Sequence, residues 1–169
     1  CVAAGWPTEG YTNYDHPLQA NVRKVAGEFF DLNMAERPWG IDGCGIPTYS
    51  LPLESLAKAM AKLARPEILG SQIQEAVEGL NAAIAAHPML IGGELSFSSK
   101  VVAETRGRVF AKMGAEGVYG LWIPERGLGI AVKCEDGATR GSEAAVAKVL
   151  ESLGFPLGFY SREITRWSG

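Results

Sequence analysis

Two side chains with reactive potential lie close together within residues 38–47: Asp42 carries a carboxylate and Cys44 a thiol. They are two positions apart, so in an extended segment they would point the same way. The glycines of this stretch let the backbone adopt positive φ and let other groups approach closely. A carboxylate oxygen, which is a hard acceptor, beside a thiol, which is a soft metal ligand, would make a plausible reactive site. A structural turn, with Cys44 packed as a small hydrophobe, explains the same residues.

Lys112 is a second candidate, because it stands between the apolar residues Ala111 and Met113 and is followed two positions later by Gly114. At the end of a strand, such a lysine can direct its ammonium group into a cleft beside bare backbone. Penicillin-recognising serine hydrolases place a Lys-Thr-Gly on such a strand to hold a carboxylate and steer protons. The alternative is a lysine that faces water from an alternating strand, with Gly114 as a turn residue.

Ser55 and Lys58 match the Ser-x-x-Lys nucleophile pattern of the same hydrolases. We expect them on the polar face of an ordinary amphipathic helix, opposite a stripe of Leu53, Leu56 and Met60. The sequence therefore argues against Ser55 as a nucleophile.

Other ligand and cofactor patterns are weak. His16 and His87 each adjoin a proline and have no nearby cysteine or acidic cluster, so we expect solvated residues at helix ends. No Gly-x-Gly-x-x-Gly or Walker pattern occurs, so nucleotide binding is unsupported. Cys134 alternates with core positions of a predicted strand, which favours packing over metal ligation.

The elements that must position these groups fall into two blocks. Amphipathic periodicity predicts a helix that follows Asp15 as N-cap and then helices over residues 50–65, 66–86 and 98–105. Three strands over residues 108–113, 118–123 and 128–135 follow, and then a helix over residues 141–153. The small residues Gly129 and Ala131 suit close coverage by that last helix. Helices followed by an antiparallel sheet predict an α+β fold, a single domain over residues 1–169.

Composition limits the function classes. The chain has 169 residues, with 16 basic and 19 acidic side chains and a net charge of −3, which gives no electrostatic footprint for nucleic acid. No segment reaches the roughly 18 apolar residues of a membrane span. Three widely separated cysteines form no disulfide framework, so a cytoplasmic protein is the default expectation. The chain begins at Cys1 in what reads as the last turn of a helix ended by Gly5, which suggests a fragment.

Several segments, in the right order along nearly the whole chain, resemble one family. It is the inducible, zinc-dependent type of bacterial L-asparaginase, whose fold is similar to that of serine β-lactamases. The segments are Gly5-Trp6-Pro7 with Tyr11, Gly40-Ile41-Asp42-Gly43-Cys44, Pro52-Leu53-x-x-Leu56-Ala57, Gly107-Arg108-Val109 and Ala111-Lys112-x-Gly114-Ala115-Glu116-Gly117. The second and the last of these are each moderately specific, and together they are quite specific.

The resemblance implies roles for individual residues. By this resemblance, Cys44 occupies the position of a zinc ligand, and Asp42 that of a site carboxylate beside it. Lys112 occupies the position of the site lysine on the central strand, and the bare backbone of Gly114 is expected to contact the substrate. The family's Ser-x-x-Lys nucleophile and its other metal-binding Cys and Lys would lie upstream of residue 1. The resemblance thus implies the carboxy-terminal part of a longer chain, with an incomplete zinc ligand set and a homodimeric assembly.

The expected reaction is hydrolysis of L-asparagine to L-aspartate and ammonia, with these 169 residues inactive alone. A glutaminase or a penicillin-binding-type hydrolase is the alternative enzyme, and a non-catalytic, partner-binding remnant is the alternative class. The asparaginase assignment requires the sulfur of Cys44 and the ammonium of Lys112 to converge on one pocket.

Overall fold

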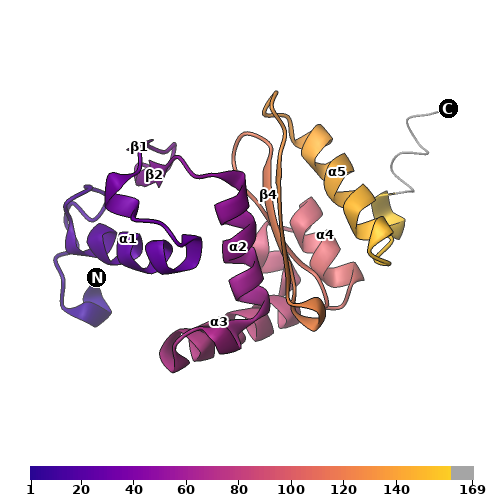
Figure 1. Ribbon diagram of the computed structural model, residues 1–169, viewed down its shortest axis with the longest axis horizontal. Helices are drawn as coiled ribbons and strands as arrows, with labels where there is room; N and C mark the ends of the chain where they lie inside the picture. Colours follow the sequence, from indigo (N-terminus) through magenta and orange to yellow (C-terminus); the bar gives the residue numbers. More distant parts are fainter. Residues whose placement is uncertain (161–169) are drawn as a thin grey trace. The chain divides into compact units, whose positions relative to one another are not determined.

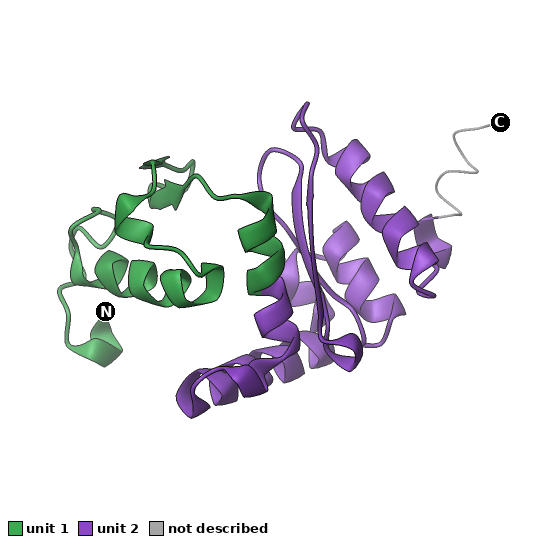
Figure 2. Ribbon diagram, viewed as in Figure 1, with its two compact units in different colours: residues 1–59 green, residues 60–169 purple. Residues whose placement is uncertain are grey.

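The computed structural model describes residues 1–160, which form helices and small antiparallel sheets (Figure 1). The predicted α+β class is confirmed. The chain divides into two compact units, Cys1–Ala59 and Met60–Gly169, and the boundary falls inside helix α2, Leu53–Ala64 (Figure 2). The expectation of a single domain stays a prediction. Within the described part of the chain, no helix has the length and apolar character needed to cross a membrane.

The first unit begins with a short 3-10 helix, η1 (Val2–Ala4), that ends at Gly5 in the left-handed region, φ 66°. Helix α1 (Pro17–Phe30) follows, with His16 as its N-cap: His16 Nδ1 accepts a hydrogen bond from the Leu18 N–H at 3.1 Å. The prediction of Asp15 as the cap is wrong by one residue. The imidazole nitrogen takes the place of the side-chain oxygen of a usual N-cap, and Pro17, which has no N–H to satisfy, occupies the first helical position.

The sequence did not predict the hairpin of β1 (Trp39–Ile41) and β2 (Pro47–Tyr49), which follows the 3-10 helix η2 (Met34–Glu36). The strands are antiparallel, with Trp39 opposite Tyr49 and Ile41 opposite Pro47. Trp39 stacks on Tyr14 with ring centroids 4.3 Å apart, and the Arg23 guanidinium lies 3.9 Å above the Tyr14 ring. These ring contacts tie the hairpin to the segment before α1 and thereby support the loop at its tip.

Helix α2 buries a different face from the one predicted. Ser55 is only 8% exposed and Ala59 2%, whereas Leu53 is 46% exposed. The stripe of large apolar residues therefore lies at the side of the buried face and not at its centre.

The second unit continues with further helical segments. They are η3 (Pro66–Ile68), α3 (Ser71–Ala86), η4 (Pro88–Ile91) and α4 (Phe97–Glu104). The single helix predicted over residues 66–86 is interrupted, because Gly70 adopts an extended backbone (φ −60°, ψ 148°) as the N-cap of α3. The predicted stop at His87-Pro88 is confirmed, since His87 is the C-cap of α3.

The sheet of the second unit has the order β3-β4-β5, with all pairs antiparallel. Its strands are β3 (Phe110–Met113), β4 (Val118–Ile123) and β5 (Leu128–Lys133); the 3-10 helix η5 (Pro124–Arg126) joins β4 to β5, and helix α5 (Thr139–Ser152) follows. All three strands and the last helix occur close to where their periodicity predicts them.

The two faces of this sheet have separate cores. Tyr119, Leu121 and Ile123 pack with residues of α4 and α5, and both helices lie on this side in Figure 1. On the opposite face, Phe110 stacks on Trp122 with centroids 5.1 Å apart, against Ala64 at the end of α2. The last helix therefore covers the large side chains of β5 (Leu128, Ile130 and Val132), and the expectation that it covers Gly129 and Ala131 is wrong.

Candidate functional site

Asp42 and Cys44 lie in the loop at the tip of the β1–β2 hairpin. The Asp42 N–H donates to the Ile46 carbonyl and the Gly45 N–H to the Asp42 carbonyl, each at 2.9 Å. Gly45 has φ 86°, a conformation that favours glycine. Asp42 Oδ1 also accepts a hydrogen bond from the Gly43 N–H at 2.7 Å, an Asx-type turn that fixes the carboxylate.

The loop brings the thiol and the carboxylate together. Cys44 Sγ donates to Asp42 Oδ2 over 3.6 Å, and both residues are exposed. A tight turn, and not the extended segment assumed from the spacing, places them side by side. The pair is thus available to a substrate, a metal ion or another chain.

The resemblance implies a zinc ion, so the described side chains must supply enough ligands to hold one. Zinc sites in proteins use three or four protein ligands. Residues 1–160 contain no group of three or more His, Cys, Asp or Glu side chains that could hold a metal ion. Asp42 and Cys44 supply two donors, so the described residues do not fit a complete zinc site.

Lys112 occupies β3, where it pairs with Gly120 of β4. Its side chain is exposed, and Nζ donates to the carbonyl of Met113 at 2.5 Å. After Gly114, whose N–H donates to the Val118 carbonyl at 2.9 Å, the chain turns through two left-handed residues, Glu116 (φ 56°) and Gly117 (φ 68°). The glycines of this segment are thus explained in part by the turn that ends the Lys112 strand.

A chain of buried polar side chains supports this end of β3, and no pattern in the sequence indicates it. The Met113 N–H points off the sheet edge and donates to Ser98 Oγ of α4 at 3.2 Å. Ser98 also interacts with the hydroxyl of Tyr119, which donates to Glu143 of α5 over 3.2 Å. Burial, followed by the charge of Glu143, raises the pKa of Tyr119, so its hydroxyl remains a proton donor. Contacts between α4, β4 and α5 create this series of hydrogen bonds, so the spacing of residues within one element cannot predict it.

The predicted site residues belong to both units. Asp42 and Cys44 lie in the first, and Lys112 and Gly114 lie in the second. The structure brings together the members of each pair, and the convergence of Cys44 with Lys112 stays a prediction.

The Ser55–Lys58 pair behaves as an accidental match. Lys58 Nζ forms an ion pair with Glu54 at 2.8 Å, and this partner raises the pKa of Lys58. A lysine held protonated by a carboxylate is a poor general base for a serine. The expectation that both residues face water is half wrong, because Lys58 is exposed but Ser55 is buried.

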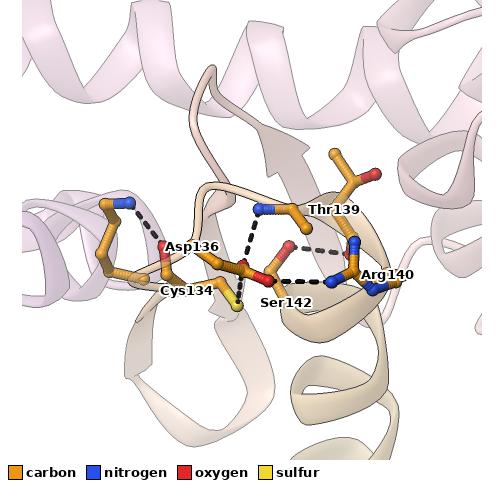
Figure 3. Close-up of polar contacts among 7 residues, drawn as sticks. Cys134, Asp136, Thr139, Arg140 and Ser142 are labelled. Carbon is orange, nitrogen blue, oxygen red and sulfur yellow. Dashed lines mark hydrogen bonds and ion pairs between the residues drawn. The ribbon is translucent and has the colours of Figure 1, made fainter.

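Cys134 lies just beyond β5 in the turn before α5, where it is half-exposed (Figure 3). Its Sγ donates to Asp136 Oδ1 at 3.0 Å, and the same oxygen accepts the Ala138 N–H. Asp136 Oδ2 pairs with Arg140 at 2.9 Å. The hydrogen bond to Asp136 raises the pKa of Cys134. The expectation of core packing is therefore wrong: the thiol belongs to a polar turn that begins α5.

Comparison with known proteins decides the family. A family model described as L-asparaginase II matches residues 1–165. The chain belongs to the L-asparaginase II family. A search of curated proteins found no match. For this asparaginase II family member, the match supports amidohydrolase chemistry at the family level, and it spans both the Asp42–Cys44 loop and the Lys112 strand.

Proposed function

We propose that this chain forms part of an amidohydrolase that converts L-asparagine to L-aspartate and ammonia. The observation that carries the proposal is the L-asparaginase II match over residues 1–165. The paired Asp42 and Cys44 at an exposed hairpin tip support it, as does the exposed ammonium of Lys112 at a strand end.

The proposed reaction passes through an acyl-enzyme. A serine Oγ from polypeptide outside these 169 residues attacks the side-chain amide carbon of asparagine, and the amide nitrogen leaves as ammonia after taking up a proton. Water then hydrolyses the resulting ester, which releases aspartate and regenerates the serine. Ser55 is not assigned this role, because it is buried and Lys58 is engaged by Glu54.

Lys112 is proposed to bind the substrate carboxylate or the developing oxyanion. Its present partner is a main-chain carbonyl, a weak competitor for an ammonium ion compared with a charged oxygen. Gly114, two residues further on, is proposed to contact the substrate through its backbone. Asp42 is proposed as the site carboxylate that orients Cys44 or a substrate amine.

Zinc is given no step in this reaction. We propose that Cys44 binds zinc, as the resemblance implies, only together with donors from outside residues 1–160, because the described residues hold no complete ligand set. The homodimer and the serine-β-lactamase-like fold likewise remain proposals that rest on the resemblance.

The test is release of ammonia from asparagine, with glutamine and a chromogenic β-lactam as competing substrates. We expect no turnover by the purified 169-residue chain and turnover of asparagine by a longer gene product that contains these residues and an upstream Ser-x-x-Lys. Preference for glutamine or the β-lactam would establish the alternative enzymes. Loss of all three activities in the longer product would favour a non-catalytic, partner-binding remnant.

A further inference from the structure

The amino end of helix α4 (Phe97–Glu104) is buried but uncapped. Ser96, its N-cap, makes no side-chain capping bond, and the first backbone bond of the helix runs from Lys100 N–H to the Ser96 carbonyl at 3.1 Å. Among residues 1–160, no acceptor is recorded for the N–H groups of the first three helical residues, Phe97, Ser98 and Ser99. These residues are 6%, 1% and 0% exposed. Buried N–H groups without a partner are costly, so most helix ends avoid them.

A buried hydroxyl is also without a partner in this place. Ser99 Oγ is inaccessible, and within the described residues it makes no hydrogen bond. Helical side chains tilt towards the amino end, so Ser99 at the third position leans over the first turn. A Cβ placed on Gly92 would lie 2.4 Å from Ser96 Oγ and 3.7 Å from Ser99 Oγ. Both hydroxyls therefore face the bare backbone of Gly92, in the loop that leads into α4.

We propose that this end of α4 binds a small oxyanion, namely a carboxylate, phosphate or sulfate group. The three N–H groups can only donate, and the hydroxyl of Ser99 can turn its hydrogen towards an anion. The helix dipole adds a partial positive charge at the same end. A negatively charged oxygen with several lone pairs satisfies these donors together, which a single neutral acceptor cannot do.

The charged neighbours limit what can bind. Glu94 is exposed two residues before Ser96 and opposes an anion, while the Lys100 ammonium lies 5.5 Å from the ring centroid of Phe159. The affinity therefore comes mainly from the helix end. Because Ser96 Oγ lies close to Gly92, we expect this end of the helix to accept only a compact ion. The site does not depend on the proposed amidohydrolase activity.

The experiment is an NMR titration of the 169-residue chain with phosphate, sulfate and acetate at constant ionic strength, with chloride as the reference anion. We expect saturable shifts of the amide signals of Phe97, Ser98 and Ser99. Ser99→Ala should weaken binding about three- to tenfold, the usual effect of one hydrogen bond. Tighter binding of acetate would identify a carboxylate ligand, and tighter binding of phosphate or sulfate a tetrahedral one.

Ser96→Asp supplies a carboxylate within the chain, so it should abolish binding of the added anion. Gly70→Asp is the matched control: it adds the same side chain at the exposed, uncapped end of α3, where a Cβ at Gly70 meets nothing within 4 Å. This variant should bind the anion like the parent chain. Equal shifts with chloride, or unchanged binding in a folded Ser96→Asp chain, would overturn the proposal, because either result leaves no ion held by these N–H groups.

Discussion

At the level of single residues, the reactivity of Cys134 depends on one carboxylate. The hydrogen bond to Asp136 raises the thiol pKa, and the same contact lowers the pKa of Asp136. We expect Asp136→Asn to lower the Cys134 pKa and to accelerate its alkylation by iodoacetamide near pH 8, because the thiolate is the nucleophile. The asparagine can still accept the Ala138 N–H, so the start of α5 is preserved. Peptide mass spectrometry measures each cysteine separately, and Cys44 should react at an unchanged rate.

The sign of the pH effect follows from the same contact. A raised folded-state pKa of Cys134 means that its stabilising contribution is present below the unfolded thiol pKa and is lost as pH rises through the folded value. The lowered folded-state pKa of Asp136 means that its carboxylate stabilises the fold at pH values above its unfolded-state pKa. This stabilisation is lost as pH falls through the folded-state pKa. Slower alkylation of Cys134 in the Asp136→Asn variant than in the parent chain would contradict the claim that Asp136 raises the pKa of Cys134.

Lys112 carries the sharpest functional prediction at this scale. In an active form of the enzyme, Lys112→Met should lower kcat/KM for asparagine by about 10²- to 10³-fold, the usual loss when a group that stabilises developing charge is removed. Unfolding should be nearly unaffected, because Lys112 is exposed and bonds only a neighbouring carbonyl. Lys148→Met, which removes an exposed lysine paired with Glu151 on α5, is the control. Equal activity of the two variants would remove Lys112 from the site.

At the level of elements, the turn after the Lys112 strand depends on Gly117. Its φ is 68°, and an added Cβ would lie 2.9 Å from Cys134 Cβ and 3.1 Å from the Gly137 carbonyl carbon. Gly117→Ala should therefore destabilise the chain by about 1–3 kcal/mol. Gly79→Ala should have the opposite sign, a gain of up to about 1 kcal/mol, because Gly79 lies inside α3 with open space around it. Urea unfolding followed by tryptophan fluorescence measures both, and a stable Gly117→Ala would show that the turn relaxes without cost.

The same elements show how far the sequence leads. Strand β5 was predictable because large apolar residues alternate with small or polar ones along Leu128–Lys133. Strand β4 shows no alternation and is almost wholly buried; its short apolar run, rich in β-branched and aromatic residues, indicates a strand instead. The β1–β2 hairpin was not predictable, because strands of three residues, mostly exposed and including Pro47, carry too little pattern. The chain of Ser98 and Tyr119, and the buried amino end of α4, were unpredictable for a different reason. They arise where segments distant in sequence pack together, and single-chain periodicity says nothing of that.

At the scale of the whole molecule, the asparaginase proposal requires one arrangement of groups from both units. The exposed thiol of Cys44 and the exposed ammonium of Lys112 should lie within reach of a short reagent that joins a thiol to an amine. We expect a cross-link from Cys44 to Lys112 in preference to one from Cys44 to Lys148 or Lys133, which are also exposed. Peptide mapping after digestion locates the bond, and Cys134→Ser removes a competing thiol. If Lys112→Arg, which removes the primary amine but keeps the charge, leaves the cross-linking yield unchanged, the reactive lysine lies elsewhere and Cys44 and Lys112 do not share a pocket.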